Sequence, residues 1–463
     1  MQVKTVQPPL QFIPPVFNTS VLNTSQKVLP FWLRYHRKIS HIQANDVERL
    51  AKLYHQFQSG KTRFLIAFRH PTLDDPACLH YLLAHILPQE AHKHDIPLRH
   101  PTHAHFIYER GIPLWAGSFA GWFFSRIGAT PIHRGKIDLV GLRSARDLFA
   151  NGSLPMAAAP EGTLNGCSER MNCLEPGVAQ LGFWCKSDLL KKGEFEQVVI
   201  LPVGIKYYYV QPNWEALSML ISQLETDCGL TIVREPTRLK TKQSRDKVLT
   251  SRLIRLSYNI LSMLEDFYTR FYHQPLPEVG SLNERLHAVQ NAALNTAERY
   301  FGLRPLGTFI ERRHRIEQAA WDWIYREDID KKQVLPAVEN GIANHIVEMT
   351  NIHLWHMRLA ESFWGLLTDY VQEKPTFERF AESTLLLWNV VNNLKGGKAK
   401  QPYLGQRWVE ITIGEEISVC QRWDEYCSNR RQAVNNLTQY LQKALESIIS
   451  PTYPNPQKVS LVS

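Results

Sequence analysis

Residues 64–76 read Phe-Leu-Ile-Ala-Phe-Arg-His-Pro-Thr-Leu-Asp-Asp-Pro. The first five residues are apolar and predict a buried strand, and His70 lies two positions beyond its end. Asp75 follows five positions later. A histidine at the carboxyl end of a strand can accept a proton from a hydroxyl when a carboxylate fixes its tautomer and stabilises the imidazolium. We therefore expect His70 to be a general base that Asp75 orients.

The two aspartates also have a purely structural interpretation. Asp75 precedes Pro76, and Asp followed by Pro is a common helix start, with Asp as the N-cap and Pro as the first helical residue. Asp74 could be the cap instead and leave Asp75 free to bond His70. The sequence leaves these interpretations open.

Strand and helix patterns alternate around this stretch. We expect strands at residues 63–68, 105–108, 154–158 and 198–206. We expect helices at residues 45–57, 76–87, 137–150 and 178–191. The alternation predicts an α/β fold, in which ligands bind beyond the carboxyl ends of the strands.

Three further blocks follow His70 and Asp75 in order. They are Gly-Ala-Thr-Pro-Ile-His-Arg at 128–134, Pro-Glu-Gly-Thr at 160–163 and Val-Ile-Leu-Pro-Val-Gly at 199–204. In this order the blocks resemble the glycerolipid acyltransferase family, which includes the glycerol-3-phosphate and 1-acylglycerol-3-phosphate acyltransferases. The resemblance covers about residues 60 to 210, and it implies a mixed sheet flanked by helices.

The resemblance also implies a role for each block. His70 would be the catalytic base and Asp75 its partner. The residues implied to bind the acceptor are Arg134, Glu161, Gly162 and Thr163, with Arg134 on its phosphate. The residues implied to line the acyl-donor pocket are Leu201, Pro202 and Val203. The implied reaction moves a fatty acyl group from acyl-CoA or acyl carrier protein to a hydroxyl of glycerol-3-phosphate or 1-acylglycerol-3-phosphate, in phospholipid synthesis. No metal or other cofactor is expected.

The sequence departs from the family pattern at two positions. Arg69 stands where the family usually has Asn, and Leu164 stands where it usually has Arg. Guanidinium groups are the usual partners of a phosphate, so more of its recognition would fall to Arg134, with help from Lys206 or Arg69. Two alternatives follow: an acyltransferase for another lysolipid or a neutral lipid, or a non-catalytic lipid-binding scaffold.

The chain divides by composition into five parts. We expect a loosely ordered arm at 1–27, the α/β domain at 28–235, a helical region at 236–400, a late strand and helix at 401–450, and a tail at 451–463. A short strand is expected at 230–234, and another at 408–415. We expect the helical region to be inserted into the α/β domain, or to pack beside it, so that the late strand returns to the sheet.

Charge and cysteine content bear on the partners and the compartment. The 463 residues include 53 Lys plus Arg and 44 Asp plus Glu, a net charge of +9. This favours anionic partners such as a phospholipid surface or an acidic carrier protein, and no nucleic-acid-binding signature is present. Seven cysteines without paired spacing indicate reduced thiols. We expect a cytoplasmic protein, without a secretory signal, peripherally associated with the cytoplasmic face of a membrane.

Residues 112–127 are the most apolar segment, but proline, glycine and serine interrupt it, so we expect a bent hairpin rather than a spanning helix. Its aromatic residues could lie at a bilayer interface or pack in the core. Seven histidines gather between residues 80 and 105, but their spacing matches no zinc motif.

Overall fold

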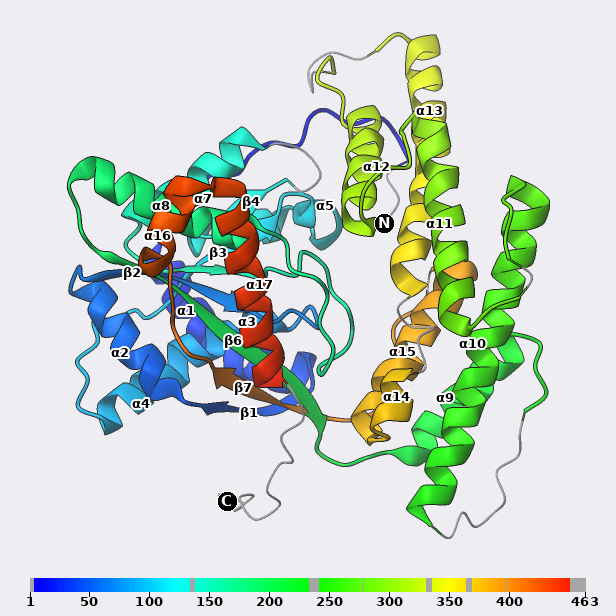
Figure 1. Cartoon of the computed structure of the whole chain (residues 1–463), viewed down its shortest axis with the longest axis horizontal. Coiled ribbons are helices and arrows are strands. Elements are labelled where there is room, and N and C mark those ends of the chain that lie inside the picture. Colours follow the sequence, from blue (N-terminus) through cyan, green and yellow to red (C-terminus); the bar gives the residue numbers. More distant parts are fainter. Residues whose placement is uncertain are drawn as a thin grey trace.

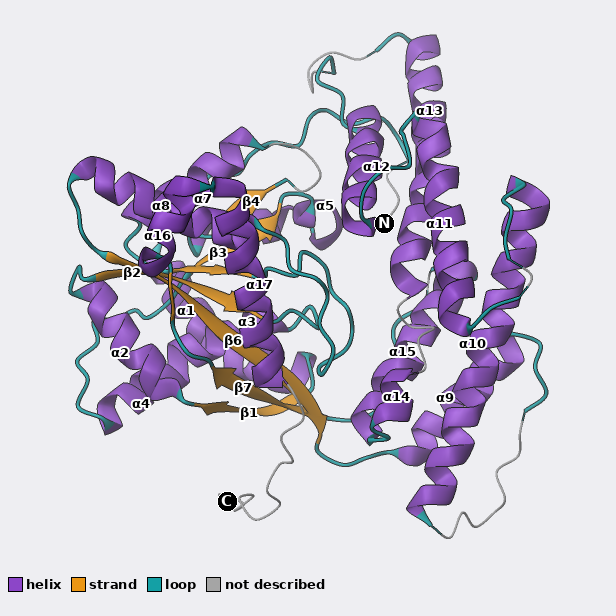
Figure 2. Cartoon of the chain, viewed as in Figure 1, coloured by secondary structure: helices purple, strands orange, loops and turns teal. Residues whose placement is uncertain are grey.

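The centre of the protein is an open, mixed sheet of eight strands in the computed structural model, which describes residues 4–133, 138–232, 241–277, 279–329, 335–363, 369–397 and 399–449. The strands are β1 (Ile39–Asn45), β2 (Thr62–Phe68), β3 (His105–Glu109), β4 (Thr130–Ile132), β5 (Met156–Ala158), β6 (Gln197–Tyr209), β7 (Arg407–Ile413) and β8 (Ile417–Ser418). Their order is β1-β7-β6-β2-β5-β3-β4, and β8 pairs with β6. The predicted α/β class with a mixed sheet and flanking helices is confirmed (Figure 2).

Parallel pairing brings the carboxyl ends of the central strands together. β6, β2, β5, β3 and β4 are parallel neighbours, whereas β7 runs antiparallel to β6 and parallel to β1. The strand predicted at residues 408–415 is therefore confirmed, and it returns to the sheet. The strand predicted at 230–234 is not seen in residues 230–232, and residues 233 and 234 lie outside the described part.

Helices cover both faces of the sheet because alternate side chains of each strand point to opposite sides. Phe64, Ile66 and Phe68 of β2 belong to one buried cluster, and Leu65 and Ala67 to the other. The first cluster is covered by α1 (Thr19–Phe31), α2 (Val47–Gln58), α3 (Asp75–Tyr81) and α4 (Leu87–Lys93). The second is covered by α7 (Leu139–Asn151), α8 (Gly177–Lys192), α16 (Trp423–Ser428) and α17 (Arg430–Ile449).

Two expectations for the N-terminal half need correction. The predicted loose arm at 1–27 contains most of α1, which begins at the N-cap Asn18 and packs through Leu22 and Leu29. The apolar segment 112–127 forms two short helices, α5 (Ile112–Ala116) and α6 (Ser118–Arg126), which meet at Gly117. Gly117 has φ +90°, where a side chain would be strained.

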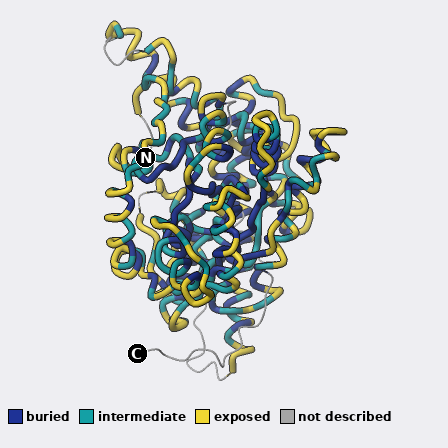
Figure 3. The backbone as a smooth tube through the Cα atoms, turned by 90° about the vertical axis from the view of Figure 1, so that its left-hand side faces the viewer, coloured by how far each residue is buried: buried dark blue, intermediate teal, exposed yellow. Residues whose placement is uncertain are grey.

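The helical region lies beside the sheet and has its own core (Figure 1). Its helices are α9 (Trp214–Asp227), α10 (Lys242–Tyr272), α11 (Leu282–Phe301), α12 (Phe309–Ile324), α13 (Ala337–Ser362), α14 (Asp369–Glu373) and α15 (Phe377–Leu394). In the sequence this region begins after β6 and ends before β7, and these two strands are neighbours in the sheet. The buried backbone runs through the interior of the molecule, and exposed segments lie along its outside (Figure 3).

Candidate active site

The turn after β2 places His70 at the carboxyl end of the central strand. The amide of Arg69 still donates to the carbonyl of Val203 on β6, at 2.9 Å, and the chain leaves the sheet at the next residue. The His70 ring packs edge-on against Phe68, with centroids 5.9 Å apart. Asp75 is the first residue of α3, so a short turn separates the imidazole from the carboxylate.

Asp75 holds the imidazole of His70 by a direct hydrogen bond. Nδ1 of His70 lies 3.0 Å from Oδ2 of Asp75. The Asp75 side chain has no exposed surface, whereas 17% of the His70 side chain is exposed. Thr72 fixes the carboxylate further, because its amide donates to Oδ2 at 2.7 Å and its hydroxyl donates to Oδ1 at 3.3 Å. The pair predicted from the sequence is therefore formed.

The helix-capping alternative does not describe these aspartates. Asp74 is the N-cap residue, but its side chain makes no capping hydrogen bond. It instead forms ion pairs with Arg37 and with Arg407, the second at 2.7 Å. Two arginines thus neutralise Asp74, and Asp75 is left to bond the histidine.

Tyr207 completes the environment of the carboxylate. Its hydroxyl donates to Oδ1 of Asp75 and also lies 3.7 Å from Sγ of Cys78. Burial raises the pKa of Asp75, and the hydrogen bonds from His70, Tyr207 and Thr72 oppose that rise. Burial likewise raises the pKa of Tyr207, so the phenol is a hydrogen-bond donor at neutral pH. Sequence reasoning missed Tyr207, because 132 positions separate it from Asp75.

This arrangement suits the imidazole to act as a base through its second nitrogen. An Asp75 carboxylate facing Nδ1 favours the tautomer with the proton on Nδ1 and the lone pair on Nε2. Within the described parts of the chain, Nε2 of His70 has no hydrogen-bond partner. It is therefore free to accept a proton from a bound molecule.

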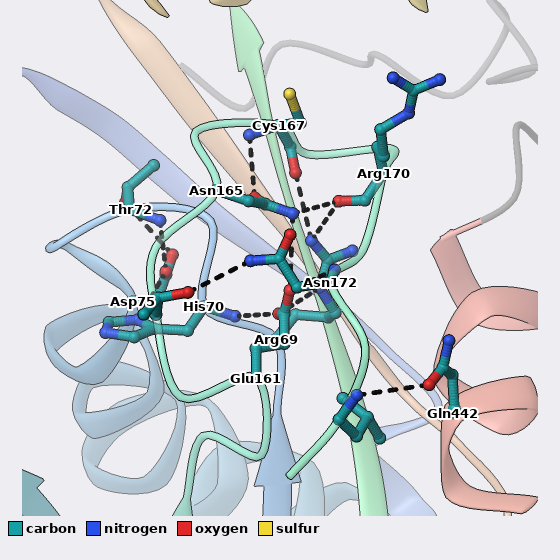
Figure 4. Close-up of polar contacts among 12 residues, drawn as sticks. Arg69, His70, Thr72, Asp75, Glu161, Asn165, Cys167, Arg170, Asn172 and Gln442 are labelled. Atoms are coloured by element: carbon teal, nitrogen blue, oxygen red, sulfur yellow. Dashed lines mark hydrogen bonds and ion pairs between the residues drawn. The ribbon is translucent and has the colours of Figure 1, made fainter. Parts of the chain in front are cut away.

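Glu161 lies beneath His70 and holds the loop that surrounds it (Figure 4). Its Oε1 accepts from Nε of Arg69 at 2.7 Å and from the amide of His70 at 3.0 Å. Its Oε2 accepts from the amide of Asn172 at 3.2 Å. Neither the Glu161 nor the Arg69 side chain has exposed surface. Glu161 positions the His70 backbone, and its expected contact with the acceptor stays a prediction.

Gly162 and Thr163 serve the same loop. Gly162 has φ +70°, and an added Cβ would lie 2.1 Å from a carboxylate oxygen of Glu175. The Thr163 hydroxyl accepts from the side-chain amide of Asn172 at 3.3 Å. Leu164 projects from the loop with 41% of its surface exposed. Thr163 and Leu164 are therefore the residues of this block that can meet an acceptor.

The residues expected to line the donor pocket lie inside the sheet. Leu201, Pro202 and Val203 pair with Ile66, Ala67 and Phe68 of β2, respectively. Leu201 and Val203 have no exposed surface and belong to the buried cluster beneath the first helical layer. These residues therefore pack in the core, and their expected contact with the acyl donor stays a prediction.

The basic residues proposed for the phosphate differ in placement. Arg134 lies outside the described residues. Arg69 is buried against Glu161. Lys206 is 4% exposed and lies 3.9 Å from Glu410, and burial lowers the pKa of its amine. Arg69 and Lys206 are therefore buried beside carboxylates, and neither presents its charge to an acceptor.

The helical region binds the loop between β5 and α8, residues 159–176, which we call the site loop. The amide of Ser168 donates to Glu382 of α15 at 3.1 Å, and Arg170 makes two hydrogen bonds to Asp369 of α14, at 3.0 and 2.9 Å. Glu169 pairs with Arg379 at 2.9 Å. These contacts hold the loop from its outer side while Glu161 holds it from within.

No protein-family model matches the chain, and no curated protein matches it either. No group of three or more His, Cys, Asp or Glu that could hold a metal ion occurs among the described residues. Within the same residues, every helix is too short or too polar to cross a bilayer.

Proposed function

We propose that the protein is an acyltransferase that moves a fatty acyl group from a thioester, on coenzyme A or acyl carrier protein, to a lipid hydroxyl. The observation that carries this proposal is the 3.0 Å hydrogen bond between Nδ1 of partly exposed His70 and fully buried Asp75 at the carboxyl end of β2. The ordered blocks that resemble the glycerolipid acyltransferases support the same reaction and its fold family.

In the proposed reaction Nε2 of His70 takes the hydroxyl proton while the hydroxyl oxygen bonds to the thioester carbonyl carbon. The carbon–sulfur bond then breaks, and the departing thiolate receives the proton from the imidazolium. Asp75 stabilises the imidazolium between these steps. The products are an ester and a free thiol, so the protons and bonds balance.

Glycerol-3-phosphate and 1-acylglycerol-3-phosphate are the acceptors that the family resemblance favours, with Arg134 as the phosphate ligand. A second candidate acceptor is a neutral or zwitterionic lysolipid. The burial of Arg69 and Lys206 and the exposed Leu164 favour this second candidate, because they remove three sites at which a cation could meet a phosphate.

The test is a product assay on the purified full chain. Labelled acyl-CoA and acyl carrier protein thioesters are offered with glycerol-3-phosphate, lysophosphatidate, lysophosphatidylcholine and monoacylglycerol, and the lipid products are separated. We expect His70→Ala to reduce transfer about a hundredfold or more. Asp75→Asn should reduce it less, because an amide still orients the ring. His345→Ala on α13, an exposed histidine, is the matched control.

The outcomes separate the candidates. Arg134→Ala should raise KM for a phosphate-bearing acceptor, by about 1.5 to 3 kcal/mol of charged hydrogen bonding, if that acceptor is the substrate. An unchanged preference between acceptors in this variant would select the neutral or zwitterionic lipid. Absence of transfer from every donor to every acceptor would leave the non-catalytic lipid-binding scaffold as the function.

A further inference from the structure

A stripe of exposed apolar side chains runs along the end of α1 and the turn of π-helix that continues it, η1 (Trp32–His36). Val28, Phe31, Trp32 and Tyr35 are 56, 67, 38 and 65% exposed, respectively. Their spacing of three, four and seven residues places them on one side of a helix. The rings of Phe31 and Tyr35 stack on each other, 6.5 Å apart, in the open.

The other side of the same helix is already in use. Leu22, Leu29 and Leu33 are at most 9% exposed and belong to the core beneath the sheet. The exposed stripe is therefore a second apolar face, which the protein's own core does not require. Several large exposed apolar residues in one contiguous stripe indicate a surface that meets an apolar partner.

The charges around the stripe indicate what this partner is. Lys27, Arg34 and Lys38 are exposed within or beside the stripe. The first acidic residue of the chain is Asp46, so residues 1–45 contain no carboxylate side chain. Aromatic residues are favoured at the level of lipid headgroups, and lysine and arginine are attracted to anionic lipids. Together they match the chemistry of an anionic membrane surface.

The stripe adjoins the candidate active site. Arg37 follows η1 directly and forms an ion pair with Asp74, the neighbour of Asp75. Leu73, in the turn between His70 and Asp75, is also 57% exposed. The stripe is thus linked through Arg37 to the turn that carries His70 and Asp75.

We propose that Val28, Phe31, Trp32 and Tyr35, flanked by Lys27, Arg34 and Lys38, form a docking surface for an anionic phospholipid bilayer. Docking brings the site to acceptors that reside in the bilayer, and this part of the inference rests on the proposed function. A second exposed aromatic pair, Phe119 and Trp122 on α6, is 70 and 46% exposed. Its own helix carries one basic residue, the half-buried Arg126, whereas three exposed basic residues flank the stripe.

The test is co-sedimentation of the full chain with vesicles of phosphatidylcholine alone or mixed with phosphatidylserine, without substrates. We expect binding to need phosphatidylserine and to weaken as salt is added. The variant Phe31→Ala/Trp32→Ala/Tyr35→Ala should bind at least about tenfold more weakly. Arg34→Gln/Lys38→Gln should bind more weakly and lose much of the salt dependence. Phe271→Ala, which removes a 71% exposed ring from α10, should bind like the parent.

The design distinguishes this inference from the proposed function. Vesicle binding is measured without turnover, so it can support the docking surface even if no acyl transfer is found. Where transfer is found, the triple variant should lose activity on acceptors in vesicles and keep it on a dispersed short-chain acceptor. Parent-like vesicle binding by the triple variant would overturn the docking surface. Loss of vesicle binding in Phe119→Ala/Trp122→Ala, with binding by the triple variant unchanged, would overturn it too. So would a parent that is a dimer and a triple variant that is a monomer with unchanged vesicle binding, because the stripe would then be a contact between two copies of the chain.

Discussion

The hydroxyl of Tyr207 donates a hydrogen bond to Oδ1 of Asp75, the oxygen that does not face His70. The ring of Tyr207 in turn lies under the guanidinium of Arg407, 4.8 Å from its centroid. The phenol of Tyr207 on β6, itself packed against Arg407 on β7, thus fixes the Asp75 carboxylate through the oxygen that does not face His70. Tyr207 is a positioning residue, because it touches the histidine only through Asp75.

Tyr207→Phe should therefore change the pH dependence of the proposed reaction more than its maximal rate. Without the phenol, the ionised form of buried Asp75 loses a donor and its pKa rises further. The active form, with a carboxylate and a neutral imidazole, then appears at higher pH. We expect the acid limb of kcat/KM to move up by about half to one pH unit. Tyr208→Phe, which loses a hydrogen bond to Glu410, is the control, and superimposable profiles would contradict the prediction.

The buried pair of Arg69 and Glu161 should show strong coupling in stability. Glu161→Gln leaves the Arg69 guanidinium buried without a counter-charge, and we expect a loss of about 3 to 5 kcal/mol in the free energy of unfolding. Adding Arg69→Met should recover part of that loss. Urea unfolding measures both, with Glu48→Gln at an exposed ion pair as the control. Additive effects of the two substitutions would show that the pair is not coupled.

The contact between the site loop and α14 can be tested by exchanging charges. Arg170→Asp or Asp369→Arg alone places like charges together, and we expect turnover to fall about tenfold as the loop shifts. The double exchange should restore most of the turnover, because the pair is re-formed in reverse. Thermal unfolding monitors the fold in parallel. A double variant no more active than the single variants would argue against this role.

Acid should destabilise the protein through a buried histidine. Burial lowers the pKa of His80 to about 4, and among the described residues its Nε2 has no hydrogen-bond partner. The unfolded chain takes up a proton near pH 6.5 and the folded one only near pH 4, so stability falls as pH drops through that window. Between pH 7 and 5 this amounts to about 2 kcal/mol. In urea unfolding, His80→Leu should lose about 2 kcal/mol less of its free energy of unfolding than the parent between pH 7 and pH 5. An equal loss in the variant and the parent would show that other groups cause the acid sensitivity.

Local patterns in the sequence sufficed for the central strands and for the hydrogen-bonded pair of His70 and Asp75. The apolar run before Arg69 predicts β2, and the spacing of His70 and Asp75 is short enough for one turn to join them. The arm was mispredicted because its Pro, Ser, Thr and Asn content hides the buried positions of α1. Burial against the core outweighed composition there.

The long-range partners could not be predicted. Arg407 is 333 positions from Asp74, and Tyr207 is 132 positions from Asp75, so their roles depend on strand order. The family pattern marks Glu161 and Val203 but does not indicate which way their side chains point. Both side chains are buried, and these two residues support the turn that carries His70.

The position of β7 between β1 and β6 makes the order of synthesis matter for this protein. β1 leaves the ribosome early, yet its partner in the described sheet is β7, which emerges more than 360 residues later. Arg407, which pairs with Asp74, lies on β7 and is synthesised with it. Until then the edge of β6 that β7 will cover is open to other chains. Completion of the sheet therefore requires translation of the whole helical region, and a message truncated before residue 407 would yield an aggregation-prone product.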